Sequence, residues 1–146
     1  MIGNPEEIGQ ARMGRMRRSV YWVFTLLLVL WLVAGGSFDL ARASGAIAIL
    51  RTLGYPPYLC TILGVAKLLA VPALLYSGAG RIQEWAYAGV AFDGIGAFLS
   101  HVAVHDTAGA TLAPLLFLTF MTISYMLRPT SARIETRSGA GARPAS

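Results

Sequence analysis

The chain has 146 residues, of which 55% are hydrophobic and only 13% charged, and its formal net charge is +5. A soluble domain carries about 25% charged residues, and a core of this size cannot hide so much apolar surface from water. The composition therefore excludes a disordered chain, argues against a soluble globular protein and indicates a membrane protein. Because the basic residues lie mostly near the two ends of the chain, lipid headgroups and membrane topology explain the charge better than nucleic acid does.

The segment ahead of the first apolar stretch, residues 1–18, is polar and basic and predicts a cytoplasmic tail. Its residues 1–15 are expected to be disordered or loosely attached to the membrane surface. Its arginines, followed by an apolar run and by Ala41-Arg42-Ala43, also resemble a signal peptide with a cleavage site. The apolar run is long for a signal peptide, and Asp39 and Arg42 crowd the site. An uncleaved first helix is therefore favoured.

Four apolar stretches follow along the chain. A membrane-spanning helix needs about 20 mostly apolar residues, and residues 19–38 and 107–127 contain no charged side chain. Two further stretches between them each carry one central charge, Lys67 in the first and Asp93 in the second. The sequence thus predicts an all-α, four-helix transmembrane bundle with spans at about 19–36, 58–77, 85–105 and 109–127, followed by a flexible tail over 130–146.

The loop between the first two spans, residues 39–57, is too long for a plain turn between two helices. Ser44 is a residue type that caps the start of helices, and Gly54 is one that ends them. The apolar residues between them are too few to cross a bilayer. We expect a short interfacial or re-entrant helix in this first outer loop.

The orientation of the chain follows from its arginines and lysines, which favour the cytoplasmic side of a membrane. The side that holds both tails and the second loop carries nine of the twelve, whereas the other side carries only Arg42 and Arg51. The twelfth, Lys67, lies within a span. This bias predicts that both termini are cytoplasmic, and we interpret the membrane as a bacterial inner membrane.

The cytoplasmic ends of the spans carry polar and aromatic residues. Glu84 and Arg81 are expected to lie near water at the mouth of the second hairpin, where a salt bridge contributes little. Tyrosine and tryptophan residues cluster near both sets of span ends, with Tyr21 and Tyr87 on the cytoplasmic side. Such clusters predict two interfacial aromatic belts.

Lys67 and Asp93 are the ionisable residues at the centres of the second and third spans. Each lies 13 residues from Gly80, in the turn between these spans, so antiparallel helices bring them to a similar depth. A lone charge in hydrocarbon is costly, and opposite charges at one depth predict an ion pair. We interpret the pair first as a structural latch that fixes helix register, and second as a proton or ligand site.

The third span presents Asp93, Ser100 and His101 on one face, with Gly89 and Gly96 close by. Small residues let helices approach closely, and polar residues hydrogen bond across the contact. Tight packing is therefore the first interpretation of this face. The second is a quinone-sized cleft lined by the three polar residues.

The histidines and the single cysteine do not indicate a metal site or thiol chemistry. His101 and His105 have the spacing that can hold a metal on one helix face, but no third ligand is evident on another segment. Cys60 is the only cysteine, so no disulfide can form within the chain, and we expect it to be a small buried filler. We expect no metal and no resident cofactor, with quinone as the alternative.

Several short motifs, taken together, resemble the DoxX-like family over roughly residues 20–129. They are Leu53-Gly54-Tyr55-Pro56, residues 62–69 (ILGVAKLL), residues 84–89 (EWAYAG) and Ser100-His101. The resemblance implies a four-helix integral membrane protein. It also implies that five polar residues occupy family motif positions: Lys67, Glu84, Asp93, Ser100 and His101.

The family takes its name from a subunit linked to thiosulfate:quinone oxidoreduction, and its relatives are linked to membrane redox complexes. The missing cysteine pair separates this chain from thiol-oxidising four-helix membrane enzymes. We therefore expect a small accessory or scaffold subunit of a membrane complex without catalysis of its own. The expected partners are the lipid bilayer and either other membrane redox subunits or a second copy of the chain. The alternatives are a quinone-interacting subunit of a membrane oxidoreductase and a small transporter or proton-conducting protein.

Overall fold

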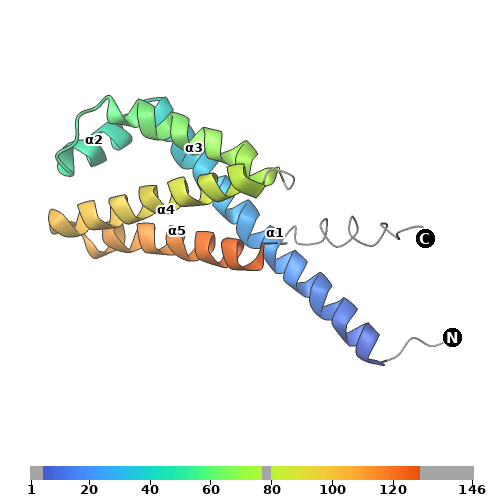
Figure 1. Ribbon diagram of the computed structural model, residues 1–146. Helices are drawn as coiled ribbons and strands as arrows, with labels where there is room; N and C mark the ends of the chain where they lie inside the picture. Colours follow the sequence, from blue (N-terminus) through green and yellow to red (C-terminus); the bar gives the residue numbers. More distant parts are fainter. Residues whose placement is uncertain (1–4, 77–79, 129–146) are drawn as a thin grey trace, which may run out of the picture.

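The computed structural model describes residues 5–76 and 80–128 of the chain (Figure 1). Within these ranges it contains five helices and no strand, which confirms the predicted all-α class. The helices are α1 (Pro5–Leu40), α2 (Ser44–Thr52), α3 (Leu59–Leu75), α4 (Gly80–Ala103) and α5 (Ala108–Leu127). The tail expected over 130–146 lies outside the described residues.

Helix α1 corrects the expectation of disorder before the first span, because the helix begins at Pro5 and runs unbroken to Leu40. The sequence holds the cause. Proline is favoured at the first helical position, and Glu6 follows where a carboxylate favours the helix dipole. Residues 9–19 are all exposed, and this part of α1 extends beyond the other helices (Figure 1).

Helix α2 is the short helix expected in the first loop, and Gly54 ends it as the sequence indicates. Gly54 has φ +81°, the left-handed region that glycine adopts without a steric penalty. Its N–H donates to the carbonyl of Arg51, and the N–H of Tyr55 donates to the carbonyl of Leu50. These two bonds are those of a Schellman motif, which satisfies the last carbonyl groups of a helix. On its inner side α2 buries Ala46 and Leu50 against the fully buried Cys60.

The four longer helices contact one another in the order α1, α3, α4, α5, and α5 returns to contact α1. In Figure 1, α2 and the connection between α4 and α5 lie at one end, and the start of α4 and the end of α5 lie at the other. One buried apolar cluster takes residues from all four helices: Leu28, Leu32, Leu74, Tyr87, Val90 and Phe117.

The surface of the helices is unusually apolar for a soluble protein, and some polar side chains are buried instead. Large apolar side chains such as Leu30, Leu69 and Met126 are exposed, whereas Thr25 and Ser124 are fully buried. Two helices are long and apolar enough to cross a membrane, Gly9–Leu40 within α1 and Ala108–Leu127, and only 22% and 11% of their apolar windows are buried. Such exposure distinguishes them from the core helices of a soluble protein, which are mostly buried.

Candidate functional site

Three charged side chains from three helices meet between α1, α3 and α4, and we call them the charged triad: Asp39, Lys67 and Asp93. The Nζ atom of Lys67 lies 2.7 Å from Oδ2 of Asp39 and 3.6 Å from Oδ2 of Asp93. The first distance is that of a charge-assisted hydrogen bond, whereas the second is an ion pair without a hydrogen bond. The three side chains are only 17–22% exposed. The sequence places Lys67 beside Asp93, but it assigns Asp39 to the outer loop.

A close crossing of α1 and α3 positions the shorter of these contacts. A Cβ atom added to Gly64 would lie 2.7 Å from the backbone nitrogen of Leu40 and 2.8 Å from the carbonyl oxygen of Gly36. Asp39 follows Gly36 by three residues and Lys67 follows Gly64 by three residues, about one helical turn in each case. The two glycines therefore allow the backbones to approach until the side chains one turn away can bond.

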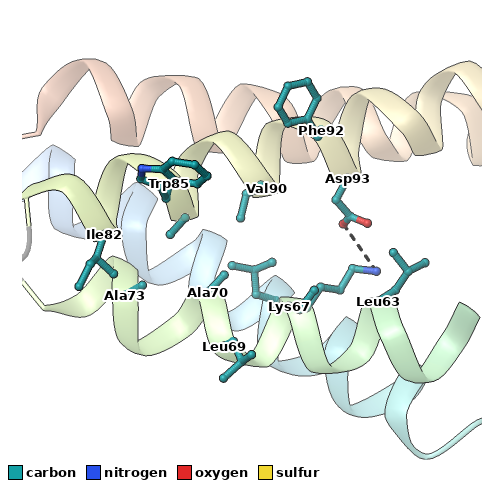
Figure 2. Close-up of a pocket in the computed structure, with 14 residues that line it drawn as sticks. Leu63, Lys67, Leu69, Ala70, Ala73, Ile82, Trp85, Val90, Phe92 and Asp93 are labelled. Atoms are coloured by element: carbon teal, nitrogen blue, oxygen red, sulfur yellow. Dashed lines mark ion pairs between the residues drawn. The ribbon is translucent and has the colours of Figure 1, made fainter.

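A groove of about 560 Å³ opens between α3 and α4 beside the triad (Figure 2). Most of its lining is apolar, and Lys67 and Asp93, which point toward one another in Figure 2, are its two charged residues. Trp85 and Gly89 belong to the α4 side of the groove. A cavity of this size is in the range of small-molecule sites, about 300–1,000 Å³.

The glycines of α4 do not play the part that the sequence suggests. A Cβ atom added to Gly89 or Gly96 would meet nothing within 4 Å, so neither glycine makes the expected close helix contact. Gly94 does, because its added Cβ would lie 2.8 Å from a methyl group of Leu118 on α5. Gly89 instead leaves space in the wall of the groove.

Ser100 and His101 bond with other partners. The Ser100 hydroxyl donates to the carbonyl oxygen of Gly96 and lies 2.9 Å from the hydroxyl of Tyr55. Neither Ser100 nor His101 lines the groove between α3 and α4. The structure therefore brings Lys67 together with Asp93, but it does not gather all three residues of the expected quinone cleft around this groove.

His101 faces the connection between α4 and α5, where its Nδ1 lies 2.8 Å from Oδ2 of Asp106. The backbone N–H of Thr107 donates to Oδ1 of Asp106 at 2.6 Å. This bond, and the His101 ring after it, hold the pKa of the Asp106 carboxyl below its usual range. Within residues 5–76 and 80–128, no group of three or more His, Cys, Asp and Glu side chains is arranged to hold a metal ion.

A second polar cluster lies buried near the other end of the helices and was missed by sequence reasoning. Ser124 Oγ lies 2.7 Å from both Thr25 Oγ1 and Tyr87 Oη, and Gln83 Nε2 donates to Tyr21 Oη at 3.3 Å. All five side chains are buried. The interfacial belt predicted for Tyr21 and Tyr87 is therefore wrong for these two residues, because both rings are buried between the helices and their hydroxyl groups hydrogen bond there.

Glu84 pairs across the helices with Arg128, whose Nη2 atom lies 2.9 Å from Glu84 Oε1. The sequence placed Arg81 beside Glu84 instead, but Arg81 forms no ion pair with any described residue. The side chain of Glu84 is 55% exposed, which agrees with its expected place near water. The guanidinium of Arg128 also lies 5.1 Å above the ring centre of Tyr125.

Replacing Glu84 with alanine is expected to change stability little. The pair is exposed on one side only, because Glu84 is 55% exposed and Arg128 is 17% exposed. Ion pairs near water contribute about 0–1 kcal/mol, so the free energy of unfolding of Glu84→Ala should fall by about 1 kcal/mol, less than for a pair with both members buried. A thermal melt of the purified protein in mild detergent measures it, with Arg81→Ala as the control that breaks no ion pair. Loss of folded protein in Glu84→Ala alone would contradict the exposed position of this side chain.

Comparison with known protein families matches residues 23–124 to the DoxX-like family. The matched region runs from α1 into the last turns of α5 and contains the charged triad and the groove. This match confirms the resemblance inferred from the motifs. No curated protein and no solved structure gave a significant match to the chain.

Proposed function

The chain belongs to the DoxX-like family, and from this premise we propose that it crosses a membrane four times, with α1, α3, α4 and α5. The exposed apolar side chains and the buried hydroxyl groups support this placement. Helix α3 has 17 residues and rises about 26 Å, close to the hydrocarbon thickness of about 30 Å. Exposed tyrosines stand next to both of its ends, at Tyr58 and Tyr76, where amphipathic rings favour the interface.

The orientation that we propose, in a bacterial inner membrane with both termini cytoplasmic, predicts the outcome of reporter fusions. A reporter that works only in the cytoplasm should be active when fused to either terminus. A reporter that works only outside the cytoplasm should be active when inserted after Arg51 or after Asp106. The reason is that most arginines lie in the two tails and in the loop that contains Arg81, and these segments share one side of the proposed membrane. Paired reporters that are each active on one side only measure this. A C-terminal reporter found outside would mean that α3 or α4 does not cross.

We further propose that the protein is a non-catalytic accessory or scaffold subunit of a membrane complex. The observation that carries this proposal is the charged triad, in which Lys67 joins α1, α3 and α4 through Asp39 and Asp93. Charged groups in this arrangement hold helices together and fix their register. Residues 9–19 of α1, which carry four arginines, are exposed and extend beyond the other helices, and they leave a surface for lipid headgroups or for a partner subunit.

The test is purification of the full chain in mild detergent, followed by native mass spectrometry of the proteins and lipids that stay bound. A partner polypeptide in fixed ratio, or a defined oligomer of the chain, is the expected result. Another tagged four-span protein from the same membrane serves as the control for non-specific capture. A monomer without a partner that reduces or oxidises a quinone would overturn the proposal.

A quinone-interacting subunit is the second candidate. The volume of the groove and the position of Asp93 at its lining favour it. It has less support because Ser100 and His101 bond with Tyr55 and Asp106 away from this groove. Quinone extracted from the purified protein in fixed ratio, and lost when the groove is filled by Gly89→Leu, would favour this candidate over the first.

A further inference from the structure

We infer that the groove between α3 and α4 is a binding site for a lipophilic monovalent cation, with the charge of the ligand against the carboxylate of Asp93. This inference goes beyond a scaffold role. It rests on the proposed membrane placement only for the route of entry, since a groove between two membrane helices opens to the lipid, where such a cation accumulates.

The charge balance of the triad is the first observation that points to a cation. Two carboxylates face one ammonium group, so the fully ionised triad carries one uncompensated negative charge. The ammonium of Lys67 hydrogen bonds to Asp39 at 2.7 Å, whereas Asp93 is 3.6 Å away and lines the groove. Helix α5, which also packs against α4, contains no charged residue. An anion would therefore meet net repulsion here, and a cation would complete the charge balance.

The shape and lining of the groove are the second observation. Its volume of about 560 Å³ and its mostly apolar walls suit a compact apolar body rather than a hydrated metal ion. Trp85 lies on α4 two turns before Asp93, and the faces of aromatic rings attract cations. Gly89 lies between these two residues and leaves the wall open, because a Cβ atom at this position would meet nothing within 4 Å.

Binding at this carboxylate has a consequence for protons. A proton and a lipophilic cation neutralise the same group, so they compete for Asp93. When the cation binds to the protonated site, the carboxyl O–H bond breaks and one proton leaves to solvent, with no change in oxidation state. The apparent affinity should therefore weaken by about tenfold for each unit by which the pH falls once Asp93 is mostly protonated, and it should not change with pH where Asp93 is ionised.

Tetraphenylphosphonium and tetraphenylborate are suitable probes, because they have nearly the same shape and opposite charge. With the purified full chain in mild detergent, calorimetry should show saturable binding of the phosphonium, at least about tenfold tighter than that of the borate. Titrations in two buffers of different ionisation enthalpy should show release of up to one proton per phosphonium bound at acid pH, where Asp93 is protonated, and none where Asp93 is ionised. Equal binding of the two ions, tighter binding of the borate, or an affinity that does not weaken at acid pH would overturn the inference.

Two pairs of variants locate the site. Gly89→Leu fills the groove and should weaken phosphonium binding by at least about tenfold, whereas Gly96→Leu, equally open but outside the groove, should not. Asp93→Asn should abolish the proton release, whereas Glu84→Gln, a carboxylate outside the groove, should retain it. Gly89→Leu leaves the triad intact, so it tests the site even if Asp93→Asn lowers the yield of folded protein. Unchanged binding in Gly89→Leu would overturn the inference. These binding measurements need no partner subunit, so their outcome does not depend on the proposed scaffold role.

Discussion

Replacing Lys67 with alanine is expected to lower the free energy of unfolding by about 3–5 kcal/mol, the usual cost of removing one member of a buried ion pair. The loss comes from the carboxylates of Asp39 and Asp93, which remain mostly buried without their common partner. Since typical stabilities are about 5–15 kcal/mol, we expect much less folded Lys67→Ala protein in the membrane. Thermal melts in mild detergent measure the loss, and Glu84→Ala is the control that removes an exposed carboxylate from an ion pair.

The two carboxylates should not be equivalent. Asp39→Asn removes the negative charge from the acceptor of the 2.7 Å hydrogen bond and should cost more than Asp93→Asn, which leaves Lys67 and Asp39 as a neutral pair. In double-mutant cycles, Lys67 should couple more strongly to Asp39 than to Asp93, within the range of about 0.5–3 kcal/mol found for contacting residues. Replacing only Lys67 and Asp93 by apolar residues should recover little stability, because Asp39 stays charged. Stronger coupling to Asp93, or none to either carboxylate, would contradict this ordering.

The sequence predicts the helical segments well because their signals are local. An apolar stretch bounded by charge, glycine or proline indicates a helix wherever it lies, and α2, α3, α4 and α5 begin and end within five residues of the expected ranges. The same local reasoning failed at the start of α1. Polarity alone predicts disorder there, although alanine, arginine, methionine and glutamine are strong helix formers.

The site was harder to predict because its third member depends on packing between distant segments. The contact of Lys67 with Asp93 can be predicted from the sequence, because two residues equally far from Gly80 lie at the same depth in a helical hairpin. Asp39 becomes a partner only because α1 continues to Leu40 and crosses α3 at Gly64. The available signal was the glycine pair at 35 and 36 in an apolar run, one turn before an acidic residue. The buried cluster at Ser124 left no comparable signal, because single hydroxyl residues in apolar helices also bond their own backbone.

Among the glycines that the structure describes, Gly64 should be the least replaceable if this crossing positions the triad. In Gly64→Ala the new methyl group would lie 2.7 Å from the backbone nitrogen of Leu40, which no change of rotamer can relieve. The backbones of α1 and α3 must move apart, at a cost of about 1–3 kcal/mol for overpacking. Gly96→Ala is the control, because its Cβ would meet nothing within 4 Å. It should be neutral or slightly stabilising, since alanine is the better helix former.

The effect of Gly64→Ala should also reach the charged triad. Because Gly36 and Gly64 each stand about one turn from the residues of the 2.7 Å contact, a wider crossing lengthens the bond between Lys67 Nζ and Asp39 Oδ2. Coulomb attraction and hydrogen bonding both fall with distance, so the coupling of Lys67 to Asp39, measured again in the Gly64→Ala background, should shrink toward that of Asp93. A loss of stability with the coupling unchanged would mean that the triad keeps its geometry without the glycine crossing. Gly64 would then only relieve a local clash.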